Sequence, residues 1–152
     1  MNNNQIEQHL LGNQILGLYP MTKNDTCFLL VIDFDKANWQ DDVTTVRTTC
    51  ANLGIDVYAE RSQSGNGCHL WFFFETEIKA SLARNFGFVI LDQSMRMNSA
   101  ISFDSYDRLF PSQDYLQEDG FGNLIALPLQ KNARQLNNSV FIDNQFMAYE
   151  DQ

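Results

Sequence analysis

The sequence has few cysteines and lacks any long apolar run. Its three cysteines, Cys27, Cys50 and Cys68, are an odd number at spacings that match no zinc motif. Two of them lie within apolar segments, so we expect reduced core residues, which favours a cytoplasmic protein. No run reaches the roughly 18 apolar residues of a membrane span, and the N-terminus has no secretory pattern. We therefore expect no membrane partner.

Basic residues are scarce as well. Lys and Arg together number 10 against 19 Asp and Glu, which gives a formal net charge of -9. DNA-binding modules usually carry a basic surplus, so any contact with a nucleic acid has to be local or mediated by metal ions. Apolar residues are plentiful at 44% of 152, enough for one domain with a substantial core. We predict a single domain over residues 1–152.

Hydrophobic patterns predict strands and helices in alternation. The segment 27–35, CFLLVIDFD, is too continuously apolar for a surface strand and predicts a central strand covered on both faces. Asn38 is a candidate N-cap for the helix that follows, which ends before Gly54. A second helix over 78–91 should bury Ile78, Leu82, Phe86 and Val89. Further elements are predicted as a helix over 6–11 and strands over 55–60, 70–74, 100–103, 123–127 and 140–142.

Together these elements indicate an α+β layer fold, a mixed sheet with helices packed on it. Its candidate chemistry begins with the two aspartates that end the first long strand. Strand side chains alternate between faces, so Asp33 and Asp35 share one face, with Cα atoms about 6.5 to 7 Å apart. Such a pair can share a divalent cation. A solvated strand end that leads into the next helix is the alternative, and the pair alone does not decide between them.

A glycine-containing loop, RSQSGNGCH at 61–69, separates two predicted strands. Gly65 and Gly67 would let backbone amides approach a ligand closely, as in an anion-binding loop. The alternative is a hairpin whose glycines only satisfy turn geometry. The side chains suited to phosphate oxygens are Ser64, Asn66 and His69.

A third acidic segment, FDSYDRLFP, occupies 103–111. Asp104 could supply a third carboxylate to a metal site with the first pair, and Arg108 could face a phosphate or an acidic neighbour. Asp107 is an equally reasonable partner for a local salt bridge. Aromatic candidates for stacking on a base, with ordinary packing as their alternative, are Tyr106, Phe110 and Phe121.

Taken in order, these segments resemble the motifs of the archaeo-eukaryotic primase superfamily: an acidic pair on a strand, a Ser/His nucleotide-binding motif and a later hydrophobic-Asp motif. They would be VIDFD at 31–35, SGNGCH at 64–69 and FD at 103–104. The sequence is more closely similar to the primase domain of TOTE conflict systems, multidomain proteins of bacterial and phage defence that join such a primase to a helicase. Most of the chain is covered by the segments that carry this similarity, HLLGNQILGLYPM, FLLVIDFDKANWQDD, ERSQSGNGCHLWFFFE, FDSYDRLFPSQD and GFGNLIALPLQ.

This resemblance implies a fold related to the RNA-recognition motif, with helices on one face of the sheet and the carboxylates on the open face. It implies a DNA primase or polymerase that uses two Mg²⁺ or Mn²⁺ ions to add nucleoside triphosphates to a 3′-hydroxyl, or to start a primer, on a DNA or RNA template. The catalytic and metal-binding residues would be Asp33, Asp35 and Asp104. The nucleotide-binding residues would be Ser64, Gly65, Asn66, Gly67, His69, Arg108 and Lys131, with Arg134 as a further contact to phosphate or template.

Some features depart from the family pattern. The loop also resembles that of polymerase domains in bacterial end-joining ligases, where a lysine is common at the position of Asn66. The family's upstream zinc-binding cysteines are absent and no helicase motifs follow Gln152, so we expect an excised catalytic domain whose helicase partner lies outside this chain. Two alternatives stay open: a non-catalytic module that binds nucleotides or nucleic acid, and another Asp-x-Asp metal enzyme such as a nuclease or a nucleotide-sugar transferase.

Overall fold

Six consecutive elements form the centre of the fold. The computed structural model describes residues 2–118 and 120–152, and its central elements run strand, helix, strand, strand, helix, strand along the chain. They are β2 (Thr26–Asp35), α2 (Trp39–Leu53), β3 (Tyr58–Arg61), β4 (Gly67–Lys79), α3 (Ala80–Met97) and β5 (Tyr106–Phe110). Their order in the sheet is β5-β2-β4-β3, and β7 (Val140–Ile142) is added beside β3. This is the ferredoxin-like arrangement that the RNA-recognition motif shares, and it confirms the predicted α+β fold.

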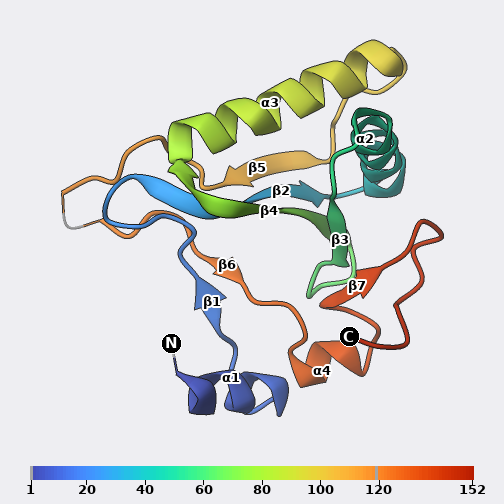
Figure 1. Cartoon of the computed structure of the whole chain (residues 1–152). Coiled ribbons are helices and arrows are strands. Elements are labelled where there is room, and N and C mark those ends of the chain that lie inside the picture. The colour runs from blue at the N-terminus through green and yellow to red at the C-terminus, as the bar shows by residue number, and fades with distance from the viewer. Residues whose placement is uncertain (1, 119) are drawn as a thin grey trace.

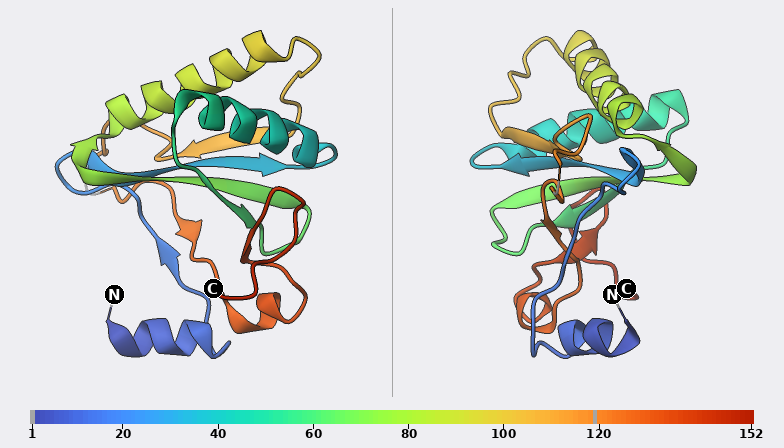
Figure 2. Two further views of the ribbon diagram at one scale, coloured as in Figure 1. Left: turned by 45° about the vertical axis from the view of Figure 1, so that its right-hand side comes forward. Right: turned by 90° about the vertical axis from the view of Figure 1, so that its left-hand side faces the viewer.

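Two layers follow from this order. Both α2 and α3 lie on one face of the sheet (Figure 1), and the turned views show the other face bordered by the short elements and both termini (Figure 2). Every pairing among the described strands of the sheet is antiparallel rather than mixed. The short elements are α1 (Asn3–Leu10), β1 (Gly17–Leu18), β6 (Ile125–Ala126) and α4 (Lys131–Arg134), of which β1 and β6 form a separate antiparallel pair.

Strand β2 is covered on both faces, as its continuous apolar run predicted. Leu30, Ile32 and Phe34 are fully buried on the helix side. On the opposite side, Leu29 and Val31 belong to a smaller cluster with residues of β4, β5 and β6. The helix-side cluster holds the main core, because side chains of α2 and α3 close it from above. The apolar alternation along β2 therefore gives way to acidic residues only at the strand's exit.

The three cysteines are free and buried, in agreement with the sequence prediction of thiols within the core. Burial raises the pKa of Cys27 and of Cys50 to about 11. Burial also raises the pKa of Cys68, with the nearby Glu60 acting in the same direction. These thiols therefore pack as small apolar side chains.

Helix α3 differs from its prediction in phase and length. Strand β4 runs directly into it, so Ile78 belongs to the strand and the helix extends to Met97. Leu82 and Val89, predicted to face inward, are 58% and 55% exposed. The helix packs instead through small residues, because an added Cβ at Gly87 would lie only 3.0 Å from a methyl group of Leu30. Within residues 2–118 and 120–152, no helix combines the length and apolarity needed to cross a membrane.

The segment before β5 also departs from the prediction. Residues 100–103 form no strand, and β5 begins at Tyr106. The preceding turn is held by α2, since the buried carboxylate of Asp42 accepts hydrogen bonds from the backbone N–H and the hydroxyl of Ser105. Asn38 lies at the predicted start of α2 but has a φ of 68° and makes no capping hydrogen bond with its side chain. Its role is to tolerate the left-handed turn.

Gly67 allows the close approach of β4 to β2 and predicts a measurable cost of substitution. It pairs with Asp35, and an added Cβ would overlap the carbonyl oxygen of Phe34. We expect Gly67→Ala to lower the free energy of unfolding by about 1 to 3 kcal/mol, the usual cost of overpacking. Chemical denaturation would measure it. Gly54→Asn is the control, because Gly54 has a φ of +68° with nothing within 4 Å, and asparagine tolerates that conformation. Equal midpoints for the two variants would contradict this account.

Candidate functional site

Side chains from neighbouring strands meet at the carboxyl end of β2. Asp33 is paired in register with His69 on β4 and with Arg108 on β5. Directly opposed residues of paired strands point to the same face of the sheet, so an acidic, an imidazole and a guanidinium group stand side by side there. The Asp33 side chain is 18% exposed. This is the face away from α2 and α3.

His69 is held between two carboxylates. Its Nδ1 donates to Oε2 of Glu60 at 2.9 Å, and its Nε2 lies 3.5 Å from Oδ1 of Asp33. Burial alone would lower the pKa of His69, but the hydrogen bond and charge of Glu60, together with the charges of Asp33 and Asp35, raise it above its ordinary value. Glu60 and the two aspartates therefore favour the charged form of the imidazole.

A pocket of about 510 Å³ opens over these residues. Its residues from β2, β4 and the loop between β3 and β4 are largely polar and include both aspartates; we call them the polar wall. Its residues from β5 and β6, with Leu124, are apolar, and we call them the apolar wall. Such an amphipathic cavity suits a ligand with a charged end and an apolar end.

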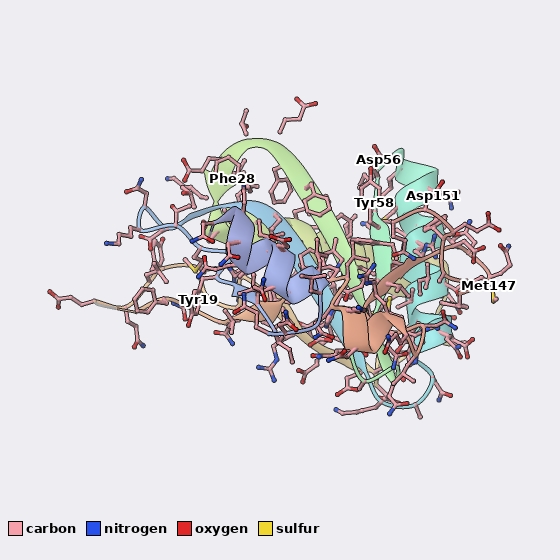
Figure 3. The ribbon with its side chains drawn as sticks, turned by 90° about the horizontal axis from the view of Figure 1, so that it is seen from below. Tyr19, Phe28, Asp56, Tyr58, Met147 and Asp151 are labelled. Carbon is pink, nitrogen blue, oxygen red and sulfur yellow. The ribbon has the colours of Figure 1, made fainter. Side chains whose placement is uncertain are left out.

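In Figure 3, which looks at the molecule from below, α1 and α4 lie in front of the sheet, and the labelled Phe28 and Tyr58 are on opposite sides of the view. The pocket is lined by Asp33, Phe34, Asp35, Ser62, Gln63, Ser64, His69, Phe110, Leu124, Ile125 and Ala126.

The loop between β3 and β4 is a tight hairpin. The backbone N–H of Ser62 donates to the carbonyl of Gly67 at 2.9 Å, and Gly65 adopts a φ of +81°. The Ser64 hydroxyl accepts a hydrogen bond from the backbone N–H of Asn66 at 3.2 Å. Turn geometry therefore explains Gly65, whereas the close approach of β4 to β2 explains Gly67. The hairpin nevertheless brings Ser62 and Ser64 to the pocket wall.

A β-bulge shapes the β5 side of the site. The register between β2 and β5 shifts after Asp33, so Asp107 has no partner on β2. In a regular strand Asp107 and Arg108 would point to opposite faces. The bulge instead allows an ion pair of 2.6 Å between them, which is the local salt bridge considered from the sequence. Bulges commonly redirect side chains next to functional sites.

Asp33 is an aspartate whose pKa the site shifts clearly. Burial raises the pKa of Asp33 above its ordinary value of 3.8; His69 and Arg108 oppose that shift, while Asp107 and Asp35 add to it. Burial is the largest cause and outweighs the compensation from His69 and Arg108, so a nearby cation would lower the cost of the charged carboxylate. Nevertheless, the described part of the chain contains no group of three or more His, Cys, Asp or Glu side chains arranged to hold a metal ion.

The other residues predicted from the sequence lie around or outside the pocket. Asp104 is exposed in the turn before β5, does not line the pocket and is not among the charges acting on Asp33. Asp107 does raise the pKa of Asp33. The strand was predicted to end just before Asp104, but β5 begins at Tyr106, so Asp107 and not Asp104 lies on the strand paired with β2. Lys131 is exposed at the start of α4, beside Gly12. Gly65, Asn66 and Gly67 belong to the hairpin but not to the pocket lining, and Arg134 donates to the carbonyl of Leu10.

The aromatic candidates separate in the same way. Phe110 lines the pocket, whereas Tyr106 packs edge-on against Phe34 and Phe121 lies against Tyr19. Sequence reasoning missed Glu60 and the apolar wall at β6. Glu60 ends a segment predicted as a strand, and the alternation along β4 could have indicated a partner for His69, but an acidic residue at a strand end is usually solvated.

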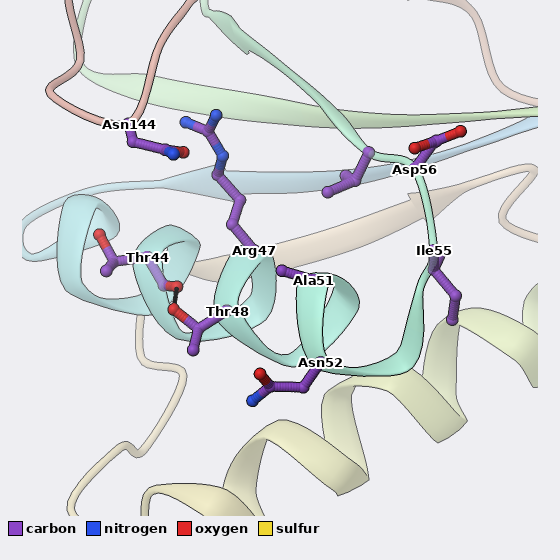
Figure 4. A pocket seen from close by; sticks show the side chains of 9 residues that line it. Thr44, Arg47, Thr48, Ala51, Asn52, Ile55, Asp56 and Asn144 are labelled. Carbon is purple, nitrogen blue, oxygen red and sulfur yellow. Dashed lines mark hydrogen bonds between the residues drawn. The ribbon is translucent and has the colours of Figure 1, made fainter.

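A second groove of about 510 Å³ lies between α2 and the segment that leads into β3 (Figure 4). Arg47 is the arginine among the described residues that line this groove, and its guanidinium donates to the carbonyl oxygen of Asp143 at 2.6 Å. None of the sequence-predicted site residues lines it. Both cavities hold acidic, basic and hydroxyl side chains, but the pocket at the end of β2 is the one lined by the sequence-predicted residues Asp33, Asp35, Ser64 and His69.

The family model described as the TOTE conflict system, Archaeo-Eukaryotic Primase domain, matches residues 1–152. The chain therefore belongs to this family, as its motifs indicated, and membership suggests a nucleotidyltransferase or primase-like role. None of the curated proteins compared with the chain matches it.

The raised pKa of Asp33 predicts that this residue costs stability in metal-free protein. Between pH 3.8 and the higher folded-state value, the folded protein binds more protons than the unfolded chain, so stability falls as the pH rises. Asparagine does not titrate. We expect the melting temperature of Asp33→Asn to exceed that of wild type at neutral pH in a chelating buffer, and the difference to shrink toward pH 3.8.

Asp104→Asn is the matched control, because it removes the same charge from an exposed turn outside the pocket. Melting temperatures followed by circular dichroism across the acidic range would make the comparison. A shift of the same size and pH dependence in both variants would contradict the assignment of strain to Asp33.

Proposed function

We propose that this domain is a template-directed nucleotidyltransferase, a DNA primase or polymerase that adds nucleotides to a 3′-hydroxyl or starts a primer. The observation that carries the proposal is the meeting of Asp33, Asp35 and His69 in one pocket, next to a hydroxyl-bearing hairpin. Family membership supports the same chemistry. The substrates would be nucleoside triphosphates, with a DNA or RNA template and primer.

The donor set fits the metal ions that such chemistry uses. Carboxylate oxygens are preferred by Mg²⁺ and Mn²⁺, and Mg²⁺ is often held by one or two carboxylates together with substrate phosphates. Asp33 and Asp35 would provide those carboxylates. When bound, two such ions would neutralise charge on the triphosphate and lower the cost of forming the 3′-alkoxide.

We assign the third carboxylate to Asp107 in place of Asp104. The support is electrostatic, because Asp107 is among the main charges that raise the pKa of Asp33 and Asp104 is not. Asp107 is paired with Arg108 in the metal-free protein. Engagement of Asp107 by a cation would free that guanidinium for a phosphate group, to two oxygens of which it can donate parallel hydrogen bonds.

The two walls of the pocket suggest how a nucleotide would be oriented. Ser64 and the protonated form of His69 on the polar wall would donate to triphosphate oxygens, and Phe110 and Ile125 on the apolar wall would face the sugar or base. Holding both ends fixes the α-phosphate near the aspartates, and positioning of this kind supplies much of the rate in phosphoryl transfer. Gly65, Asn66 and Gly67 would act by shaping the hairpin.

Template binding would rely on groups outside this pocket. The net charge of -9 makes a broad electrostatic grip on nucleic acid unfavourable. Lys131 is exposed, and we assign it to contacts with template phosphates. A helicase domain or another replication partner outside this chain would supply the remaining affinity.

One observation favours a second candidate, a module that binds nucleotides without catalysis. No three-ligand group is present among the described side chains, and the only arginine paired with Asp33 in register is already engaged by a carboxylate. Such a module would bind nucleoside triphosphates but incorporate none. The same assay separates the two candidates.

The first test is incorporation of labelled dNTPs and NTPs on primed and unprimed templates with Mg²⁺ or Mn²⁺. We expect template-dependent extension by wild type and none by the variant carrying Asp33→Ala and Asp35→Ala, because the metal-binding carboxylates are gone. Glu75→Gln, on the same sheet but exposed and outside the pocket, should extend like wild type. Nucleotide binding without extension by wild type would favour the non-catalytic module, and no binding at all would remove the functional support.

A comparison of Asp107→Asn with Asp104→Asn tests the third carboxylate. We expect Asp107→Asn to slow extension by at least about a hundredfold, the scale seen when one stabilising group is removed from an active site. Asp104→Asn should remain within about threefold of wild type because its side chain lies in an exposed turn. The reverse order of activities would return the third position to Asp104.

A further inference from the structure

Glu60 is a buried carboxylate to which the function proposed above assigns no role. It is 2% exposed and lies on β3, which is separated from β2 by β4. Burial of a carboxylate is costly unless donors satisfy it. Its donors are Nδ1 of His69 and Nε1 of Trp71, both 2.9 Å from Oε2, and the hydroxyl of Ser139, 3.4 Å from Oε1.

These contacts leave the His69 ring one orientation. A carboxylate only accepts hydrogen bonds, so Nδ1 of His69 must carry the hydrogen and Nε2 must face the pocket. Trp71 packs edge-on against the imidazole, with ring centroids 6.3 Å apart and an interplanar angle of 83°. Because Trp71 donates to the same oxygen, it also holds the Glu60 carboxylate in place. A flipped His69 ring would leave this oxygen with a single donor.

We infer that Glu60 is a positioning residue, which turns Nε2 of His69 toward the ligand in the pocket. The inference rests on the proposed function in one respect, that this ligand is a nucleoside triphosphate. Glu60 itself does not line the pocket, so its effect on the ligand passes through His69. Outer partners that fix a histidine ring commonly change the affinity or activity of the site they support by about 10- to 100-fold.

His9, the other of the two histidines in the sequence, provides an internal reference. Its Nε2 donates to the carbonyl oxygen of Pro128 at 2.9 Å, and its Nδ1 accepts from the backbone N–H of Leu16 at 3.1 Å. His9 therefore has the opposite tautomer to His69. The two rings can be told apart in one nitrogen NMR spectrum, and His9→Gln would assign them.

The test is the tautomer of each ring at alkaline pH, followed by ¹⁵N-detected correlations in metal-free protein. Wild type should have Nδ1–H at His69 and Nε2–H at His9. Glu60→Gln should keep both, because the amide oxygen still accepts from His69. Glu60→Ala should release His69 to the Nε2–H form that a free imidazole favours, and leave His9 unchanged. Ser139→Ala is the matched control, since it removes a donor to Glu60 but leaves the other two contacts.

The second measurement is the Kd for dATP with Mg²⁺ in the absence of template. We expect it to be about tenfold weaker in Glu60→Ala and within about threefold of wild type in Glu60→Gln and Ser139→Ala. Should Glu60→Ala fail to fold, Glu60→Asp replaces it with the same expectation, because it withdraws the carboxylate by one methylene.

An unchanged His69 tautomer in Glu60→Ala would overturn the inference. A changed tautomer with an unchanged Kd would also overturn it, because Glu60 would then have no effect on the ligand. If wild type bound no dATP at all, the proposed function would fail, while the tautomer measurement would still decide whether Glu60 orients His69.

Discussion

The double pairing of β2 is the constraint on which the rest of the site depends. This strand is hydrogen-bonded to β4 on one side and β5 on the other, with Asp33 opposite His69 and Arg108. A shift of one residue in either register would turn the partner side chain to the helix face. The apolar residues of β2 oppose such a shift, since Leu30 and Ile32 are fully buried under the helices. Core packing and site geometry therefore have a single cause.

The same packing makes the site electrostatically unfavourable in the absence of a ligand. Asp33 is largely buried next to other carboxylates, and its raised pKa reflects that environment. His69 compensates part of this charge while also satisfying the buried Glu60. Strain of this kind is common where function requires charge that folding alone would avoid. A cation or a protonated imidazole lowers the cost, so ligand binding and stability are linked.

The sequence predicted the parts of the site that local patterns determine. The acidic pair follows from alternation along an apolar strand, and the burial of the cysteines follows from their neighbours. The hairpin at Gly65 follows from its composition. The β-bulge at Asp107 could not be predicted, because it depends on the pairing of β2 with a strand more than seventy residues away in the chain. The phase of α3 was wrong because the pattern counted large apolar residues such as Leu82, while close packing against the sheet selected the small Gly87.

The ion pair between Asp107 and Arg108 suggests how an acidic domain can accept an anionic substrate. Both side chains are well exposed, at 33% and 50%, and exposed pairs of this kind contribute only about 0 to 1 kcal/mol. A cation that attracts the carboxylate and a phosphate that attracts the guanidinium would each gain more than the pair loses, provided that both arrive together. A metal-bound triphosphate has that combination of charges. Under the proposed function, the pair would therefore oppose the metal or the phosphate alone and open for their complex. The local charge pattern, and not the net charge of -9, would then decide what binds.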